Sequence, residues 1–154
     1  ATSSATAIGL SNAIASELAT RSEALAAGEP VTGPRIVLVV DDYEILAAGG
    51  QGVLSPVLAY LPSARDLRVN VVLARPVAGI GSAMFDQAFQ ALRDTGATCL
   101  LMDGDRSEGQ VFGMRPTHLA PGRGWWIRRG RRPRMCQVAD FSTNVTDPAE
   151  PNRM

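Results

Sequence analysis

Lysine is absent from this sequence of 154 residues, because all 15 of its basic residues are arginine. Any chemistry that needs a lysine within the chain is therefore excluded, including a Schiff base and the phosphate-binding loop GxxxxGK[ST]. Cysteine and histidine are also scarce, with Cys99, Cys136 and His118 as their only examples. Two cysteines cannot form a disulfide framework, so the sequence indicates a reducing compartment. His118 has no cysteine or acid at ligand spacing, which argues against a zinc site.

Long hydrophobic runs and an excess of one charge are missing too. The longest apolar run, Ile36 to Val40, is far shorter than the roughly 18 residues that a membrane helix needs. The 15 arginines are balanced by 15 acidic residues, so the net charge does not point to nucleic acid or anionic lipid. Nothing at the start reads as a signal peptide. Apolar residues nevertheless make up 45% of the chain, enough for the core of a single domain.

The apolar residues alternate between helical and strand patterns. Leu10, Ile14, Leu18 and Leu25 predict one face of a helix over residues 4–27. Further helices are expected over residues 53–61 and from a cap at Ser82 to Gly96, and strands over residues 35–41, 68–74 and 98–102. The first strand is continuously apolar, which predicts burial of both of its faces. This order predicts an α/β fold with a mainly parallel sheet and helices on both faces.

The last third of the chain has a different character. Residues 124–129 and 134–139 flank Gly130–Pro133 and predict a β-hairpin with a four-residue loop. The hairpin carries many arginines, and no acidic residue lies between residues 109 and 139. Residues 142–154 are rich in serine, threonine, asparagine and proline, so we expect a disordered tail after a domain of residues 1–141.

Two adjacent carboxylates, Asp41 and Asp42, follow the apolar strand. Ligands of open α/β sheets bind at the carboxyl ends of strands, where one carboxylate can hold Mg²⁺ and its neighbour can orient or deprotonate a water. Alternation along the strand complicates this pairing, since neighbouring side chains point to opposite sides unless the strand ends between them. The alternative is that the pair solubilises the strand end, with Asp42 capping a helix that begins at Tyr43.

Receiver domains of two-component signalling also place Asp-Asp after such a strand. They need a phosphoacceptor aspartate at the end of a later strand and a lysine after a further one. Here the later strand ends in Leu73-Ala-Arg-Pro76, without an aspartate, and the chain has no lysine. A long helix also precedes the motif. This interpretation is therefore rejected.

The RecA-like P-loop ATPases place the same pattern in their Walker B strand. Three segments resemble the last ATPase module of EccC, the FtsK/SpoIIIE-family motor of type VII (ESX) secretion. They are Gly33-Pro-Arg-Ile-Val-Leu-Val-Val-Asp-Asp-Tyr43, Leu61-Pro-Ser-Ala-Arg-Asp-Leu-Arg-Val-Asn-Val-Val-Leu-Ala-Arg75 and Leu101-Met-Asp-Gly-Asp-Arg-Ser-Glu-Gly-Gln-Val-Phe-Gly113, continued by Leu119-Ala-Pro-Gly-Arg-Gly124. The resemblance covers roughly residues 33–140 and implies a partial RecA-like fold.

The resemblance implies roles for individual residues. Asp41 is then the Walker B carboxylate associated with Mg²⁺, and Asp42 takes the place of the catalytic glutamate. Because Asp42 is one methylene shorter than glutamate, its carboxylate lies farther from an attacking water and its role is weakened. Arg75 follows the next strand, where relatives carry a polar sensor; the alternative is a surface arginine. The interpretation requires a sheltered aspartate pair on a strand that is not the rim of an antiparallel sandwich.

Arginines elsewhere are candidates for contacts with partners. Arg106 and Arg115 lie near where a subunit-bridging arginine would reach a neighbour's nucleotide, although solvated loop arginines are the plainer alternative. The arginines of the hairpin region, with Trp125 and Trp126, fit nucleic acid, an acidic protein segment or a solvated edge that resists strand pairing. In an EccC-like context a protein is the better functional partner. These hairpin-region arginines are Arg123, Arg128, Arg129, Arg131, Arg132 and Arg134.

The phosphate cradle is missing from this chain, so it contains only the second half of a nucleotide site. The resemblance implies ATP and Mg²⁺ as cofactors of the intact module, and we expect neither to bind tightly to this chain alone. It also implies a hexameric motor at the cytoplasmic face of the inner membrane, with the other modules and small helical ESX proteins as partners. The alternatives are a non-hydrolysing adaptor and, less well supported, a DNA-translocating module. Without its other half the sheet is expected to expose apolar edges and faces.

Overall fold

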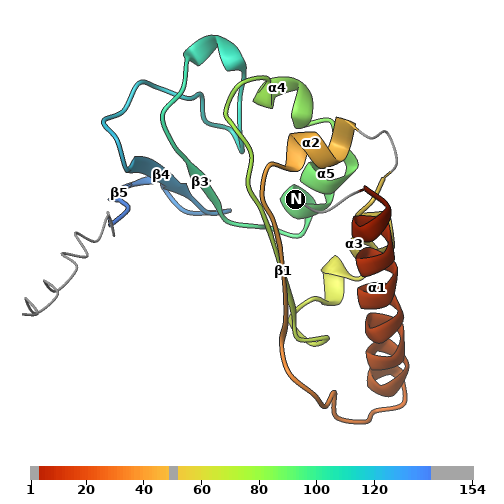
Figure 1. Cartoon of the computed structure of the whole chain (residues 1–154). Coiled ribbons are helices and arrows are strands. Elements are labelled where there is room, and N and C mark those ends of the chain that lie inside the picture. The colour runs from red at the N-terminus through yellow and green to blue at the C-terminus, as the bar shows by residue number, and fades with distance from the viewer. Residues whose placement is uncertain (1–3, 49–51, 140–154) are drawn as a thin grey trace, which may run out of the picture.

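The computed structural model describes residues 4–48 and 52–139. Figure 1 shows the first helix lying alongside the first strand, with the last three strands on the other side of the molecule. In chain order the elements are α1 (Ser4–Ala26), β1 (Ile36–Val40), α2 (Tyr43–Ala48), α3 (Ser55–Leu58), the 3-10 helix η1 (Leu61–Ser63), β2 (Val69–Leu73), α4 (Ile80–Ala83), α5 (Gln87–Asp94), β3 (Cys99–Leu101), the 3-10 helix η2 (Arg106–Glu108), β4 (Arg123–Ile127) and β5 (Arg134–Gln137).

β1 and β2 form a parallel pair, as the sequence predicts. Their register runs from Ile36 opposite Val69 to Val40 opposite Leu73. Both strands are made of β-branched and leucine side chains apart from Asn70, which suits a pleated surface packed against a core. The inward-facing Leu38 and Val69 are buried. The two strands therefore end at the same level, which places the residues after Val40 next to those after Leu73.

The opposite face of this strand pair is open, and the expectation that β1 would be buried on both faces is wrong for the described residues. Val37 is 57% exposed and Val39 is 63% exposed, and Val72, which pairs with Val39, is 49% exposed. Strand geometry sends alternate side chains to opposite faces, so a continuously apolar strand such as β1 has two apolar faces whether or not both are covered. The β1–β2 pair therefore does not have helices on both of its faces. The exposure of an apolar face, which the sequence predicts, is observed.

The remaining strands form a separate antiparallel sheet in the order β3–β4–β5. The hairpin β4–β5 is confirmed, although its connection runs over residues 128–133 and is longer than predicted. β3 was expected to join the parallel sheet, and instead Leu100 pairs with Trp126 of β4. The α/β class is confirmed, and parallel pairing among the described residues is confined to β1 and β2. A short strand such as β3 carries no residue pattern that distinguishes the two kinds of partner.

α1 confirms the predicted helix, but its buried face differs from the predicted apolar face. Leu18 is fully buried, whereas Leu10 and Leu25 are exposed at 53% and 41%. The buried positions on either side of Leu18 are polar, Ser11 and Arg21. The guanidinium of Arg21 donates hydrogen bonds to the carbonyl oxygens of Leu67 and Pro34 and pairs with Glu17 at 2.8 Å.

The single helix expected from Ser82 to Gly96 is divided into α4 and α5. Asp86 breaks it, because its side chain accepts a hydrogen bond from the Ala88 amide and caps α5. Phe85 then falls between the two helices and is 80% exposed, while Phe89 is buried. Ser82 lies inside α4, where its hydroxyl donates to the Gly79 carbonyl. Asp86, four residues after Ser82, is therefore the residue that caps α5, in place of the predicted cap at Ser82.

α4 packs closely on the loop that follows η2. A β-carbon added to Gly81 would lie 2.8 Å from the Glu108 carbonyl oxygen, and one added to Gly109 would lie 2.7 Å from the Gly81 α-carbon. The Gly79 amide donates to the Glu108 carboxylate at 2.6 Å, beside this contact. Only glycine allows the two backbones to approach so closely.

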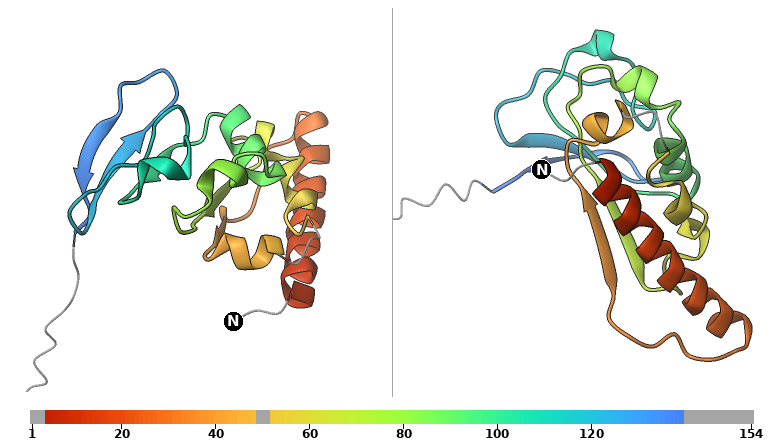
Figure 2. Two further views of the ribbon diagram at one scale, coloured as in Figure 1. Left: turned by 90° about the horizontal axis from the view of Figure 1, so that it is seen from above. Right: turned by 45° about the vertical axis from the view of Figure 1, so that its right-hand side comes forward.

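One core joins the two sheets. Buried residues from α1, β1 and β2 belong to the same hydrophobic cluster as Leu101 of β3 and Ile127 of β4. Figure 2 shows the β3–β4–β5 sheet set away from α1, with the shorter helices between them. Among the described residues, no helix has the length and apolar character needed to cross a membrane. The expected tail of residues 142–154 and the end of the predicted domain at residue 141 lie outside the described residues.

Replacing Arg21 with methionine should destabilise the fold by about 2–3 kcal/mol, because two carbonyl oxygens would lose their donor beneath α1. Urea unfolding followed by circular dichroism measures this loss. Arg65→Met is the matched control, since Arg65 is exposed and its loss should change the unfolding free energy by about 0.5 kcal/mol or less. Equal losses for the two variants would show that the Arg21 hydrogen bonds do not hold α1 in place.

Burial raises the pKa of the Cys99 thiol to about 11. In a Cys136→Ser variant, which leaves Cys99 as the single thiol, alkylation by iodoacetamide should therefore be slow at neutral pH. Its rate should rise about tenfold per pH unit and still be rising at about pH 10, because the thiolate is the reactive form. A plateau near pH 9 in folded protein would contradict the raised pKa, and unfolded protein in urea provides the comparison.

Candidate functional site

The aspartate pair lies in the turn between β1 and α2. β1 ends at Val40 and α2 begins at Tyr43, so Asp41 and Asp42 belong to neither element. Asp42 has a φ of 49°, a left-handed conformation that aspartate tolerates better than most residues. Its amide donates to Asp41 Oδ1 at 3.0 Å. The strand thus ends before the pair, which removes the alternation that would otherwise fix the two carboxylates on opposite faces.

A cavity of about 390 Å³ lies at this turn, lined by β1, by α1 and by the segment around Leu54. Both Asp41 and Asp42 line it, together with Ser11 of α1. Ser11 is 2% exposed, and its hydroxyl has no hydrogen-bond partner among the described residues. Both aspartates are exposed, which contradicts the sheltered pair that the Walker B interpretation requires. The parallel pairing of their strand agrees with that interpretation. The candidate site is therefore a solvent-accessible cavity with two exposed carboxylates in its lining.

Arg75 is brought next to this turn by the parallel register. The Tyr43 amide donates to the Ala74 carbonyl at 2.9 Å, and the Ala74 amide donates to the Val40 carbonyl at 2.8 Å. The guanidinium of Arg75, however, donates to Pro76 and Ala78 of its own loop, at 3.1 and 2.8 Å. The structure therefore places Arg75 beside the carboxylate turn with its hydrogen bonds directed into the β2–α4 loop.

Tyr43 connects the turn to α5, which the sequence interpretation did not anticipate. Its hydroxyl donates to Asp86 Oδ1 at 2.7 Å, the oxygen that also caps α5, and its ring meets Phe89 edge-on at 5.5 Å. Burial, followed by the Asp86 carboxylate, raises the pKa of Tyr43 above its ordinary value, so the hydroxyl keeps its proton well into the alkaline range. A polar aromatic residue directly after Asp41 and Asp42 was the available signal. A partner 43 residues away could not be read from it.

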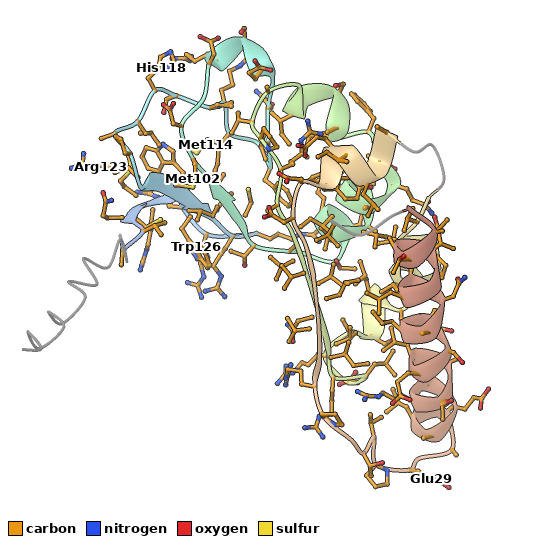
Figure 3. The ribbon with its side chains drawn as sticks, in the orientation of Figure 1. Glu29, Met102, Met114, His118, Arg123 and Trp126 are labelled. Carbon is orange, nitrogen blue, oxygen red and sulfur yellow. The ribbon has the colours of Figure 1, made fainter. Side chains whose placement is uncertain are left out.

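Arg106 and Arg115 lie together in the long loop between β3 and β4. Arg115 donates to the Arg106 carbonyl at 3.2 Å, and both side chains are exposed. His118 lies at the outer edge of this loop in Figure 3. Its Nδ1 is 3.6 Å from Asp103 Oδ1, and its Nε2 is 3.6 Å from Asp105 Oδ2. Hydrogen bonds from Ser107 lower the pKa of Asp105. These arginines belong to an exposed, charged surface loop and do not line the Asp41 cavity.

The hairpin arginines are likewise exposed and apart from the aspartates. Arg128, Arg129, Arg131 and Arg132 all lie in the connection between β4 and β5. Arg129 donates to the Asp94 carbonyl at the end of α5. None of the four lines the Asp41 cavity, so the predicted site residues fall into three groups. The first is Asp41, Asp42 and Arg75, the second is Arg106 and Arg115, and the third is the arginine connection, which is residues 128–133 between β4 and β5.

The residues at the turn fit one side of a Mg²⁺–nucleotide site. Mg²⁺ commonly uses one or two carboxylates and completes its shell with water and phosphate oxygens. Asp41 and Asp42 supply such carboxylates, and the described part of the chain holds no cluster of three or more acidic, histidine or cysteine side chains able to bind a metal by itself. The lysine and glycine-rich loop that hold the phosphates are absent from the sequence. The donor set therefore suits a metal already bound to a nucleotide.

Comparison with known proteins identifies relatives with one common description. No protein-family model matches the chain. It is 42% identical over 109 residues to the ESX-4 secretion system protein EccC4 of Mycobacterium tuberculosis. It is 35% identical over 109 residues to the ESX secretion system protein EccC of Thermomonospora curvata. These matches cover 70% of this chain and only 9% and 8% of the two relatives, so the chain corresponds to a small part of their length.

Solved structures agree with the sequence matches. The structure of Thermomonospora curvata EccC (ATPases 2 and 3) in complex with a signal sequence peptide matches with a TM-score of 0.81 and 31% identity, over 92% of this chain and 27% of that one. A structure described as an ATPase matches with a TM-score of 0.75 and 27% identity, over 88% of this chain and 53% of that one. Together with the α/β fold, these similarities show that the chain belongs to the EccC family of ESX secretion ATPases.

Proposed function

We propose that this chain is the later half of a RecA-like ATPase module, the C-terminal one, in an ESX secretion motor. Asp41, at the carboxyl end of a parallel strand and on the rim of a cavity, is the observation that supports this most. Asp41 would hold Mg²⁺ directly or through water, and Arg75, at the end of the neighbouring strand, would sense the nucleotide. Bound Mg²⁺ and ATP would supply phosphoryl-transfer chemistry, whose free energy drives export.

The open face of β1 and β2 supports a site completed by another part of the protein. Three exposed valines form an apolar surface on the parallel pair, which is unusual for strands of this type. A lysine-bearing phosphate loop must come from outside this sequence if the site binds ATP. We therefore expect the other half of the module to cover this face and to contribute the phosphate cradle.

In the parent motor we expect the remaining modules and a homo-oligomeric ring as partners, with Arg106 or Arg115 reaching a neighbouring subunit. The cargo would be small helical proteins that carry a C-terminal signal, at the cytoplasmic face of the inner membrane. A signal sequence peptide is present in the structure of the Thermomonospora relative, which supports this choice of cargo. A DNA-translocating role is less favoured. It predicts salt-dependent DNA binding by the arginine connection, measurable in a gel-shift titration at low salt.

A non-hydrolysing adaptor is the second candidate function, and the geometry of Asp42 favours it. Asp42 is shorter than the glutamate whose place it takes, and its φ of 49° fixes it in a tight turn. One of the two Asp41 carboxylate oxygens, Oδ1, already accepts the Asp42 amide. In this alternative the module recognises cargo or stabilises the ring without turning over ATP.

The chain by itself should bind Mg-ATP weakly or not at all, because it has no backbone amide cradle with a lysine for the phosphates. Isothermal titration calorimetry of the isolated chain should show no binding in the micromolar range. The full-length motor titrated under the same conditions is the positive control. Micromolar affinity in the isolated chain would refute the description of it as half of a site.

Two substitutions in the full-length motor separate the candidate functions. Asp41→Asn should weaken Mg²⁺-dependent ATP binding by about tenfold or more, as expected when a carboxylate on the metal is lost. Asp42→Glu should raise the rate of ATP hydrolysis, because it restores the missing methylene. Glu29→Gln, an exposed carboxylate on the loop after α1, is the matched control and should change neither quantity.

The adaptor alternative predicts ATP hydrolysis that is unchanged by Asp42→Glu. If Asp41→Asn binds Mg-ATP as tightly as Glu29→Gln does, Asp41 is not the Walker B carboxylate. Measuring binding and hydrolysis separately distinguishes loss of the metal carboxylate from loss of the group that acts on water.

A further inference from the structure

A second cavity, with a volume of about 730 Å³, lies where the β4–β5 connection, the end of α5 and the turn at Phe112 meet. It is separate from the cavity of about 390 Å³ at the aspartate turn. Its lining contains both apolar side chains and arginines. The proposed nucleotide site uses none of these residues, so the cavity needs an explanation of its own.

The apolar part of the lining is held rigidly. Ile127 belongs to β4 and is 5% exposed. Phe112 and Met114 belong to a tight turn closed by two backbone hydrogen bonds between Val111 and Met114, at 2.8 and 2.9 Å. The two central residues of that turn have φ values of 51° and 84°, as in a type I′ turn. Met84 completes the apolar lining. A partner would therefore meet a preformed apolar surface.

The charged part of the lining is almost entirely positive. Four of the lining residues are arginines, and Asp94 is the single carboxylate among them. Asp94 is already engaged, since its carboxylate lies 3.3 Å from Arg93 and its carbonyl accepts from Arg129. Arg128 and Arg131 are exposed, and their guanidinium groups have no hydrogen-bond or ion-pair partner among residues 4–48 and 52–139. Two free guanidinium groups thus stand beside an apolar cavity.

We infer that this cavity is a docking site for an acidic amphipathic segment of a partner protein. Apolar side chains of the segment would enter the cavity against Met114 and Ile127, and its carboxylates would pair with Arg128 and Arg131. The match in charge rests on the absence of acidic residues between residues 109 and 139. Guanidinium groups also suit carboxylates better than ammonium groups do, because they donate two parallel hydrogen bonds.

Nucleic acid fits the same cavity less well. Single-stranded nucleic acid is bound by arginines together with exposed aromatic rings on which bases stack. Trp126 is the exposed tryptophan of the hairpin, but adjacent residues of a strand point to opposite faces, so it lies on the other side of the sheet from Ile127. Figure 3 shows Met114 and Trp126 on opposite sides of the β3–β4–β5 sheet. Trp126 instead lines a separate hollow of about 350 Å³, together with Arg128 and Arg131. Trp125 shares the face of Ile127 but is partly buried against the core and does not line the cavity. A base stacked on Trp126 would therefore leave the apolar lining of the cavity unoccupied.

Fluorescence anisotropy with the full 154-residue chain tests the inference. The probe is a fluorescein-labelled helical peptide built from leucine and glutamate, with the leucines on one face. It should bind, and added salt should weaken it. Arg128→Glu together with Arg131→Glu should weaken binding by about tenfold or more, because two attractive pairs become repulsive. The matched control, Arg35→Glu with Arg65→Glu, makes the same change in charge at exposed positions outside the cavity and should retain the affinity.

Three further probes make the result decisive. Replacing leucine by serine in the peptide should abolish binding, and replacing glutamate by glutamine should weaken it. A labelled single-stranded DNA of similar length should bind more weakly than the acidic peptide. The inference is overturned if the peptide fails to bind, if the two double variants behave alike, or if the DNA binds more tightly. Because these readouts involve neither Asp41 nor ATP, they are independent of the proposed nucleotide site.

Discussion

The buried guanidinium of Arg21 is the interaction on which the arrangement of the candidate site depends. It reaches from α1 to the carbonyl of Pro34, just before β1, and to that of Leu67, just before β2. A guanidinium is costly to bury unless its donors are used, and here three partners use them. By holding the starts of both strands against one helix, Arg21 helps to set their level. Strands that start together and have equal length also end together, which is why Asp41 and Arg75 become neighbours.

Much of the fold could be predicted because the relevant signals are local. Five consecutive apolar residues predicted β1. The residue patterns of β2 and of the two hairpin strands predicted those strands in the same way. What could not be predicted depended on partners. The apolar pattern of α1 did not show that Ser11 and Arg21 would face inward, since burial of Arg21 requires two distant carbonyls. The pairing of β3 with β4 was likewise a choice between distant partners.

The candidate site shows the same division. The position of Asp41 and Asp42 at a strand end followed from the sequence, and the parallel register then accounts for the closeness of Arg75. The hydrogen bond from Tyr43 to Asp86 was not predictable, because it depends on how α2 meets α5. The left-handed conformation of Asp42 was not apparent from its residue type either. The arginine-rich connection was visible in the sequence, whereas the apolar turn at Phe112 that completes its cavity was not. A charge cluster is a local property, and a cavity is a property of the assembled fold.

The contact between Gly81 and Gly109 limits which substitutions this chain can accept. At Gly81 the obstacle is purely spatial, since a methyl group would collide with the Glu108 carbonyl. At Gly109 a φ of 103° adds a conformational obstacle to the spatial one. No exchange of side chains can therefore adjust the spacing between α4 and the neighbouring loop. The distance between α4 and the loop at Gly109 can change only if the main chain moves, through an insertion, a deletion or a different path of that loop.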